Sequence, residues 1–203
     1  MKAPLFRIAL ALCAFAACAQ PASQKAARED SVQQQAATPA APEALLAPGE
    51  RAGKFRLGQD MDSVFSLLGK PDDGDAAMGK AWGIWYGTDT IAVYSTYADS
   101  NMNRRVARQI VVSGEGYRTV NGIGRNTPLE TIRENFPALQ PAATYVSDTH
   151  DTLWVYDAQA AGIAFDLRKK DGQLLCHAVT IHDKQEPVTA TYLTIHAGWK
   201  KLP

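Results

Sequence analysis

Apolar and polar positions alternate with a helical period after Gly58, and this pattern predicts a short helix that closes at Gly69. Asp60 can cap the free amides of the first turn, while Gly69 and Pro71 end the element. Four apolar residues recur at intervals of three and four positions and therefore share one face of the helix: Met61, Val64, Phe65 and Leu68.

The same pattern returns between Gly122 and Pro137. Thr127 is the expected cap, Pro128 suits the first helical position, and Glu130 completes a capping box with Thr127. Three apolar residues form the face of this second helix: Leu129, Ile132 and Phe136. The sequence therefore predicts two short amphipathic helices that divide the chain at regular places.

Alternation with a period of two follows each helix and predicts antiparallel strands. The expected strands cover residues 80–86, 90–97 and 105–112 in the first half, and 153–156, 162–168 and 174–182 in the second. Each half is too small to be stable alone, so the two should pack together. The expected fold class is α+β, with two tandem helix-β-β-β repeats whose antiparallel sheets carry helices packed on one face.

The changes in pattern divide the chain into four parts. We expect a signal peptide at 1–18, a disordered Ala/Pro/Gln tether at 19–52, a first helix-plus-sheet repeat at 53–121, and a second repeat with a C-terminal tail at 122–203. The tether segment is rich in Ala, Gln, Pro and Ser and has no apolar period, so it cannot bury enough surface to offset the entropy of ordering.

The N-terminus has the organisation of a secretory signal. Lys2 and Arg7 precede an uncharged run that is shorter than the ~20 apolar residues of a membrane-spanning helix. The segment Phe15–Cys18 is similar to a bacterial lipobox, in which the cysteine is acylated with diacylglycerol and palmitate and becomes the mature N-terminus. Cleavage after Ala19 is the alternative, because Ala17 to Ala19 also forms an ordinary cleavage site.

A family resemblance rests on the two motifs Gly58 to Pro71 and Gly122 to Pro137, each followed by a meander. They resemble the β-lactamase inhibitor protein, which is built from two tandem helix-plus-sheet repeats, and the small outer-membrane lipoprotein of the β-barrel assembly machinery. The resemblance implies a non-catalytic binding or assembly role and identifies no contact residues. Together with a lipid anchor, it implies an outer-membrane lipoprotein that faces the periplasm; a soluble periplasmic or secreted protein is the alternative.

Composition restricts the partners. The chain carries 21 Lys plus Arg and 21 Asp plus Glu, so no basic surplus indicates a nucleic-acid partner. Cys176 is the one cysteine certain to remain in the folded part, so we expect no intramolecular disulfide and a small buried side chain at this position. We expect no cofactor and no metal, and the oligomeric state stays open.

Aromatic residues give the best indication of a surface. Five of them crowd two neighbouring predicted strands: Trp82, Trp85, Tyr86, Tyr94 and Tyr97. If one face of this sheet is open, these residues form a recognition patch for a protein or for a stacking ligand. The alternative is that both faces are covered.

Catalytic patterns are sparse. Cys176 and His177 are neighbours on a predicted strand and point to opposite faces, so they cannot form a dyad. The loop at 147–151 brings together Asp148, His150 and Asp151, which is either a polar turn or a site for hydrolysis. We therefore expect a non-catalytic envelope lipoprotein that binds a protein or peptide and is not an enzyme. The alternatives are a periplasmic small-molecule or glycan binder and a hydrolase.

Overall fold

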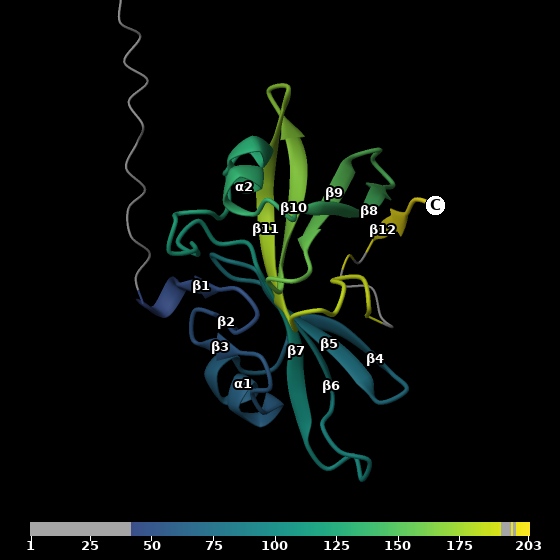
Figure 1. Cartoon of the computed structure of the whole chain (residues 1–203). Helices are drawn as coiled ribbons and strands as arrows, with labels where there is room; N and C mark the ends of the chain where they lie inside the picture. Colours follow the sequence, from purple (N-terminus) through teal and green to yellow (C-terminus); the bar gives the residue numbers. More distant parts are fainter. Residues whose placement is uncertain (1–41, 192–195, 197) are drawn as a thin grey trace, which may run out of the picture. The chain divides into compact units, whose positions relative to one another are not determined.

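The computed structural model describes residues 42–191, 196 and 198–203, which Figure 1 shows in colour. The expected signal peptide, Cys18 and residues 19–41 of the expected tether lie outside the described residues. Within the described part, no helix is long and apolar enough to cross a membrane.

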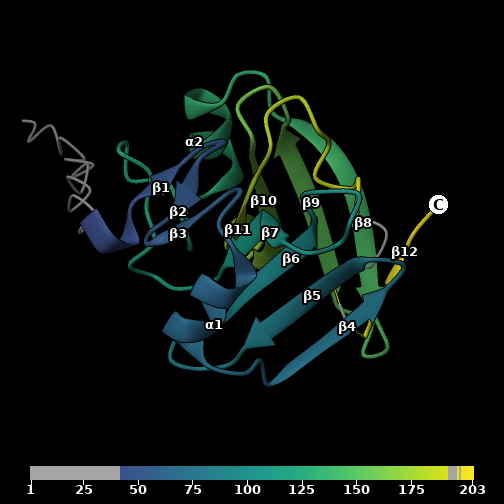
Figure 2. The same cartoon turned by 90° about the horizontal axis from the view of Figure 1, so that it is seen from below.

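Most described residues belong to one nine-stranded antiparallel sheet with the order β12-β8-β9-β10-β11-β7-β6-β5-β4. The strands are β4 (Asp73–Ala77), β5 (Lys80–Trp85), β6 (Ile91–Tyr97), β7 (Arg105–Val112), β8 (Gln140–Ser147), β9 (Thr152–Ala158), β10 (Ile163–Lys170), β11 (Gln173–His182) and β12 (Trp199–Lys201). The sheet curls strongly across its width, as the view in Figure 2 shows.

A smaller layer faces this sheet. It contains a 3₁₀ helix (Pro42–Ala44), the three-stranded sheet β1 (Leu46–Ala47), β2 (Arg51–Ala52) and β3 (Phe55–Arg56), and the helices α1 (Met61–Leu68) and α2 (Leu129–Asn135). Asp60 caps α1 as expected, because its carboxylate accepts from the Asp62 N–H at 2.9 Å. Thr127 does not cap α2; its hydroxyl accepts from the Gly124 N–H at 3.1 Å, and Pro128 takes the N-cap position.

The expected fold class of two tandem helix-β-β-β repeats is wrong, and so is the family resemblance that was drawn from those repeats. Helix α1 is followed by four strands and α2 by five, and the strands of both halves join in one sheet through the pairing of β7 with β11. Val112 pairs with Val179 and Gln109 with His182 along this seam. The described part is therefore mostly β, and the two halves share one sheet.

Strands β4 and β8 are among those that the sequence analysis did not predict, and both lack the usual apolar signal. β4 has the sequence DGDAA and is exposed at all but its last position, so it lacks an apolar face. β8 begins with Gln140 and Pro141, which are typical of a loop, and it is half-buried over most of its length. Backbone pairing to β5 and β9 holds these segments as strands, where the apolar pattern alone does not.

The described residues before the expected boundary at residue 53 contain regular structure. The last residues of the expected 19–52 tether form the 3₁₀ helix, β1 and β2. Leu46 is only 1% exposed and its N–H donates to the Arg118 carbonyl at 2.8 Å, while Ala52 is fully buried. A short apolar anchor is enough to order this segment, because a partner strand and the main core are already in place.

Apolar side chains pack on both faces of the large sheet. The main core lies between the sheet and the smaller layer, and it includes Val64 of α1, Ile132 of α2 and Phe165 of β10. The opposite face holds two smaller clusters. One contains Trp82 and Tyr94, and the other contains Val188, which lies beyond the last residue of β11.

A buried polar network holds the segment after β11 against this second face. His182 is 1% exposed, and its Nε2 lies 3.0 Å from Oδ1 of Asp157. The other oxygen of Asp157 accepts from the Val188 N–H at 2.8 Å, and the Gln109 amide donates to the Val188 carbonyl at 2.9 Å. Strands β7, β9 and β11 thus all contribute to fixing Val188.

Candidate functional site

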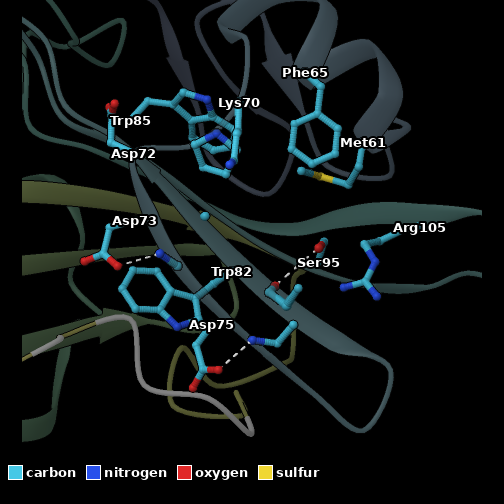
Figure 3. A pocket seen from close by; sticks show the side chains of 15 residues that line it. Met61, Phe65, Lys70, Asp72, Asp73, Asp75, Trp82, Trp85, Ser95 and Arg105 are labelled. Atoms are coloured by element: carbon cyan, nitrogen blue, oxygen red, sulfur yellow. Dashed lines mark hydrogen bonds between the residues drawn. The ribbon is translucent and has the colours of Figure 1, made fainter.

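A groove opens at one edge of the large sheet, between α1 and the β4–β5 hairpin (Figure 3). Its volume is about 680 Å³. That size lies within the ~300–1,000 Å³ that is typical of ligand sites. Strand β4 is the last strand of the sheet on this side, so the groove lies beside a sheet edge. The lining comes from α1, residues 70–72, the β4–β5 hairpin, and single positions on β6 and β7.

An apolar wall forms one side of the groove. Met61 and Phe65 lie one turn apart on α1, and Phe65 meets Trp85 of β5 at a ring-centroid distance of 6.1 Å. The Trp85 indole N–H donates to the Gly69 carbonyl at 3.0 Å, which fixes the end of α1 to the sheet. Trp85 is 6% exposed and Phe65 is 40% exposed. The wall therefore presents one accessible aromatic ring on a rigid support.

Small residues form the floor. Gly74 pairs with Gly83, and Ala76 pairs with Ala81, across the β4–β5 ladder. A Cβ atom on Gly83 would lie 3.1 Å from Cβ of Pro71 and 3.2 Å from the Trp85 ring. Gly83 thus permits Pro71 to lie close to β5. The small residues Gly74, Ala76 and Ala81 leave the space above the rest of the floor open.

Three carboxylates surround the groove, and each accepts a hydrogen bond from a nearby backbone N–H. Asp72 accepts from Tyr86, Asp73 from Gly74, and Asp75 from Ala76, each at 2.7 Å. Asp73 and Asp75 lie on β4 itself, so their negative charge also discourages pairing of another chain with this edge.

Two cations also line the groove. Among the described residues, neither Lys70 nor Arg105 forms an ion pair. The Arg105 guanidinium lies 4.6 Å from the centroid of the Tyr97 ring, which positions it without neutralising it. Figure 3 shows Lys70 near the aromatic wall and Arg105 on the far side of Met61. The groove therefore combines apolar surface with two cationic groups that remain available to a ligand.

The five aromatic residues of the sequence analysis are not gathered on one exposed surface. Trp82 and Tyr94, at 6% and 5% exposure, pack together on the second face of the sheet, and Trp85 belongs to the main core. Tyr86 is 59% exposed, and Tyr97 is half-buried beneath Arg105. Trp82 and Trp85 do border the groove, so part of the predicted set lies at the candidate site.

The loop with Asp148, His150 and Asp151 is a hairpin turn between β8 and β9. The Ser147 hydroxyl accepts from the Asp151 N–H at 3.1 Å, and His150 takes the left-handed conformation with φ of 65°. Asp148 pairs with Lys200 at 3.2 Å on the surface. Among the described residues, no hydrogen bond or ion pair joins His150 to either carboxylate, and the contacts of Ser147, Asp148 and Asp151 are those of a polar turn.

The cysteine and histidine candidates of β11 are also separated. Cys176 is 2% exposed, and burial raises the pKa of its thiol. Burial, followed by the charges of Arg168 and Arg125, lowers the pKa of His177 to about 4. Within the described residues, no group of three or more His, Cys, Asp or Glu side chains is placed to hold a metal ion.

A second, smaller pocket of about 270 Å³ lies on the opposite face of the sheet. It contains Asp166, and burial raises the pKa of this carboxyl group although His196 and Arg168 act in the other direction. Nδ1 of His196 lies 3.7 Å from Asp166, and Trp199 lies under the Arg168 guanidinium at 5.0 Å. These contacts join the described C-terminal residues to the sheet.

Sequence reasoning missed three residues that line the groove beside Trp82 and Trp85. Phe65 was assigned to an apolar helix face, Arg105 was placed at the start of a strand, and Lys70 was given no role. The usable signal was the small-residue pattern of Gly74, Ala76, Ala81 and Gly83, which leaves one face of a hairpin empty beside an amphipathic helix.

Comparisons with known proteins assign no family. No protein-family model matches the chain, and no curated protein matches its sequence. Among solved structures, the chain is similar to a cysteine-rich secretory protein of Staphylococcus aureus subsp. aureus Mu50, with 12% sequence identity and a TM-score of 0.41. The match covers 70% of this chain and 49% of the other, so the chain spans about half the length of that protein. At this level the similarity establishes neither a shared fold nor a shared function.

Proposed function

We propose that this protein is a non-catalytic binding protein of the cell envelope, and that its groove holds a peptide segment of a protein partner. The observation that carries the proposal is an open groove with an accessible aromatic wall and two cations without ion-pair partners among the described residues. The ligand that fits has one large apolar side chain to lie against Phe65 and one or more carboxylates to meet Lys70 and Arg105.

The shape of the groove favours an extended segment over a bulky ligand. Its floor consists of paired small residues along two strands, so it runs beside the sheet edge as a shallow track. An extended peptide presents alternate side chains to such a surface, which allows one of them to fill the space beside Phe65. Lys70 and Arg105 can each meet a carboxylate of the segment, while Asp72, Asp73 and Asp75 repel one from the β4 side, so the charges fix where an acidic residue of the segment can lie.

The chemistry of the lining supports binding. Of the side chains that line the groove, Ser95 alone carries a hydroxyl group, and this group donates to the Ala81 carbonyl at 3.2 Å. Neither histidine nor cysteine is found among the described lining residues. The three carboxylates of the lining, Asp72, Asp73 and Asp75, each accept a backbone N–H, and no hydroxyl or thiol paired with a histidine is present among the described lining residues.

Selection of peptides provides the test. A library of random peptides displayed on phage is selected against the intact processed chain, and the affinities of the enriched sequences are measured by calorimetry. We expect enriched peptides to combine a large apolar residue with Asp or Glu. Phe65→Ala should weaken their binding about tenfold, since one well-placed aromatic contact is worth roughly 1–3 kcal/mol.

Leu67→Ala is the matched control. Leu67 lies on the same helix and is 48% exposed, but it does not line the groove. Binding that is reduced equally by Phe65→Ala and Leu67→Ala would contradict the proposed site, and a selection that enriches no sequence would contradict peptide binding itself.

The cell-envelope location rests on the sequence before residue 42, and acylation of Cys18 is part of the same proposal. Intact-mass measurement of the mature protein from membranes should show Cys18 as the N-terminal residue with its acyl chains. A mature chain that begins at Gln20 without added mass would instead show simple cleavage and a protein free of any lipid anchor.

A further inference from the structure

Two exposed methionines occupy the tips of neighbouring hairpins. Met78 lies in the β4–β5 turn and is 80% exposed, and Met102 lies in the β6–β7 turn and is 62% exposed. Both side chains are large and apolar, yet neither is buried by the rest of the described chain. Their exposure therefore adds nothing to the stability of the fold.

The backbone at both positions is unfavourable for methionine. Met78 has φ of 50° and Met102 has φ of 55°, in the left-handed region where glycine and asparagine are the usual residues. Gly79, Asn101 and Asn103 are the immediate neighbours, so residues suited to these turns are present one position away. An apolar side chain at each strained tip position has a cost to folding and no compensating contact, which points to a role outside the folded chain.

The two tips belong to the same end of the sheet. Strands β5 and β6 are antiparallel, with Lys80 opposite Thr96, so the β4–β5 turn lies alongside the residues that lead into the β6–β7 turn. A Cβ atom on Gly79 would lie 3.4 Å from the Tyr97 ring, which confirms how close the first tip is to β6. Figure 1 shows both turns at the lower end of the sheet.

Cationic residues accompany both tips. Lys80 follows Met78, and Arg104 and Arg105 follow Met102. The one carboxylate in these turns, Asp99, accepts hydrogen bonds from the backbone N–H groups of Asn103 and Arg104 at 3.3 and 3.2 Å. The two turns thus combine a net positive charge with two apolar side chains at the outermost positions.

We propose that this tip surface, made of Met78, Lys80, Met102 and Arg104, docks on a lipid bilayer that contains anionic headgroups. Apolar side chains beside cations are the combination that binds a membrane interface, because the apolar groups enter the acyl boundary while the cations meet phosphate groups. Two separate methionines at the tips of thin hairpins can enter the interface together without unfolding either hairpin. This contact is independent of the groove and of any lipid on Cys18.

Binding to vesicles of defined composition tests the proposal. The mature chain from residue 18 onward is produced without the signal segment and with Cys18→Ser, so that no acyl chain can be attached. It is sedimented with vesicles of phosphatidylethanolamine and phosphatidylglycerol or of phosphatidylcholine alone. We expect tighter binding to the anionic vesicles. The double variant Met78→Ser with Met102→Ser should lower the partition coefficient about tenfold. Arg104→Glu should lower it on anionic vesicles only.

Two control variants separate a specific surface from general stickiness. Val120 is 86% exposed and lies outside both hairpins, so Val120→Ser should leave binding unchanged. Lys170 is exposed on the β10–β11 hairpin, and Lys170→Glu should also have no effect. Equal losses in the controls and the tip variants would overturn the proposal.

A fluorescent label reports insertion directly. Met78→Cys provides a labelling site in the Cys18→Ser chain, because the remaining thiol of the folded part, Cys176, is 2% exposed. We expect the emission of an environment-sensitive dye at this position to shift to the blue on anionic vesicles, and a dye at Val120→Cys to show no shift. If the emission of the dye at the Met78 position does not shift on anionic vesicles, insertion is overturned. Insertion is also overturned if the emission shifts when a protein partner is added but not when vesicles are added.

Discussion

The buried pair of Asp157 and His182 makes the strongest energetic prediction. Nδ1 of His182 lies 3.0 Å from the Asp183 carbonyl, and Nε2 lies 3.0 Å from the Asp157 carboxylate. Both ring nitrogens thus lie within hydrogen-bond distance of an oxygen atom, and the Asp157 carboxylate is an acceptor for the ring. Asp157→Ala removes the partner of Nε2 and also leaves the Val188 N–H without its partner.

The expected loss follows from burial. Asp157 is 6% exposed and His182 is 1% exposed, so water cannot readily replace the missing carboxylate. Removing one member of a buried hydrogen-bonded pair costs about 3–5 kcal/mol. Asp157→Asn should cost much less, about 1 kcal/mol, because its amide oxygen can still accept from the Val188 N–H and its amide group can still form a hydrogen bond with the His182 ring.

Urea denaturation followed by circular dichroism measures both variants. Asp148→Ala is the control, because Asp148 and Lys200 form an ion pair at 3.2 Å in which both side chains are 83% exposed. We expect no measurable shift of its denaturation midpoint, since exposed ion pairs contribute little. An Asp157→Ala variant as stable as Asp148→Ala would refute the assignment of the network as the anchor of Val188.

Three further predictions concern single residues. Gly83→Ala should destabilise the fold and narrow the groove, because the new Cβ would lie 3.1 Å from Cβ of Pro71 and 3.2 Å from the Trp85 ring. We expect a lower melting temperature and weaker peptide binding. An unchanged melting temperature would contradict this. The pKa of His177 is lowered to about 4, so the unfolded chain binds a proton on this ring more tightly than the folded chain does. The contribution of His177 to the free energy of unfolding should therefore fall as the pH drops from about 6.5 to 4. An NMR titration of the ring that gives an ordinary midpoint would contradict this. Burial raises the pKa of Cys176, so iodoacetamide should modify it in the urea-unfolded chain and not in the folded one, as mass spectrometry would record.

The sequence was sufficient for local structure where an apolar pattern was complete. The four apolar positions from Met61 to Leu68 predict α1, and the alternation from Ile91 to Tyr97 predicts β6, because burial of one face dictates these patterns. The joining of β7 to β11 could not be predicted in this way. A pairing between distant strands leaves no periodic signal in either of them, so two halves that share a sheet look like two separate repeats.

The candidate site was harder to predict than the fold. The aromatic residues drew attention to β5 and β6, but Trp82 and Tyr94 are buried because the second face of the sheet carries its own apolar cluster. The groove exists because the β4–β5 floor has small residues in place of large side chains and because Phe65 of α1 lies beside this floor. Lys70 and Arg105 come together with this floor only through tertiary structure.

The central claim is that the groove between α1 and β4–β5 is the peptide-binding site. The most direct test is to titrate an enriched peptide into the isotopically labelled, intact processed chain and follow the backbone amide resonances by NMR. The account predicts that the largest shifts fall on Phe65, Lys70, Gly83 and Arg105, and that they are lost in the Phe65→Ala variant. Shifts that centre on the opposite face of the sheet, around Asp166 and His177, would contradict it.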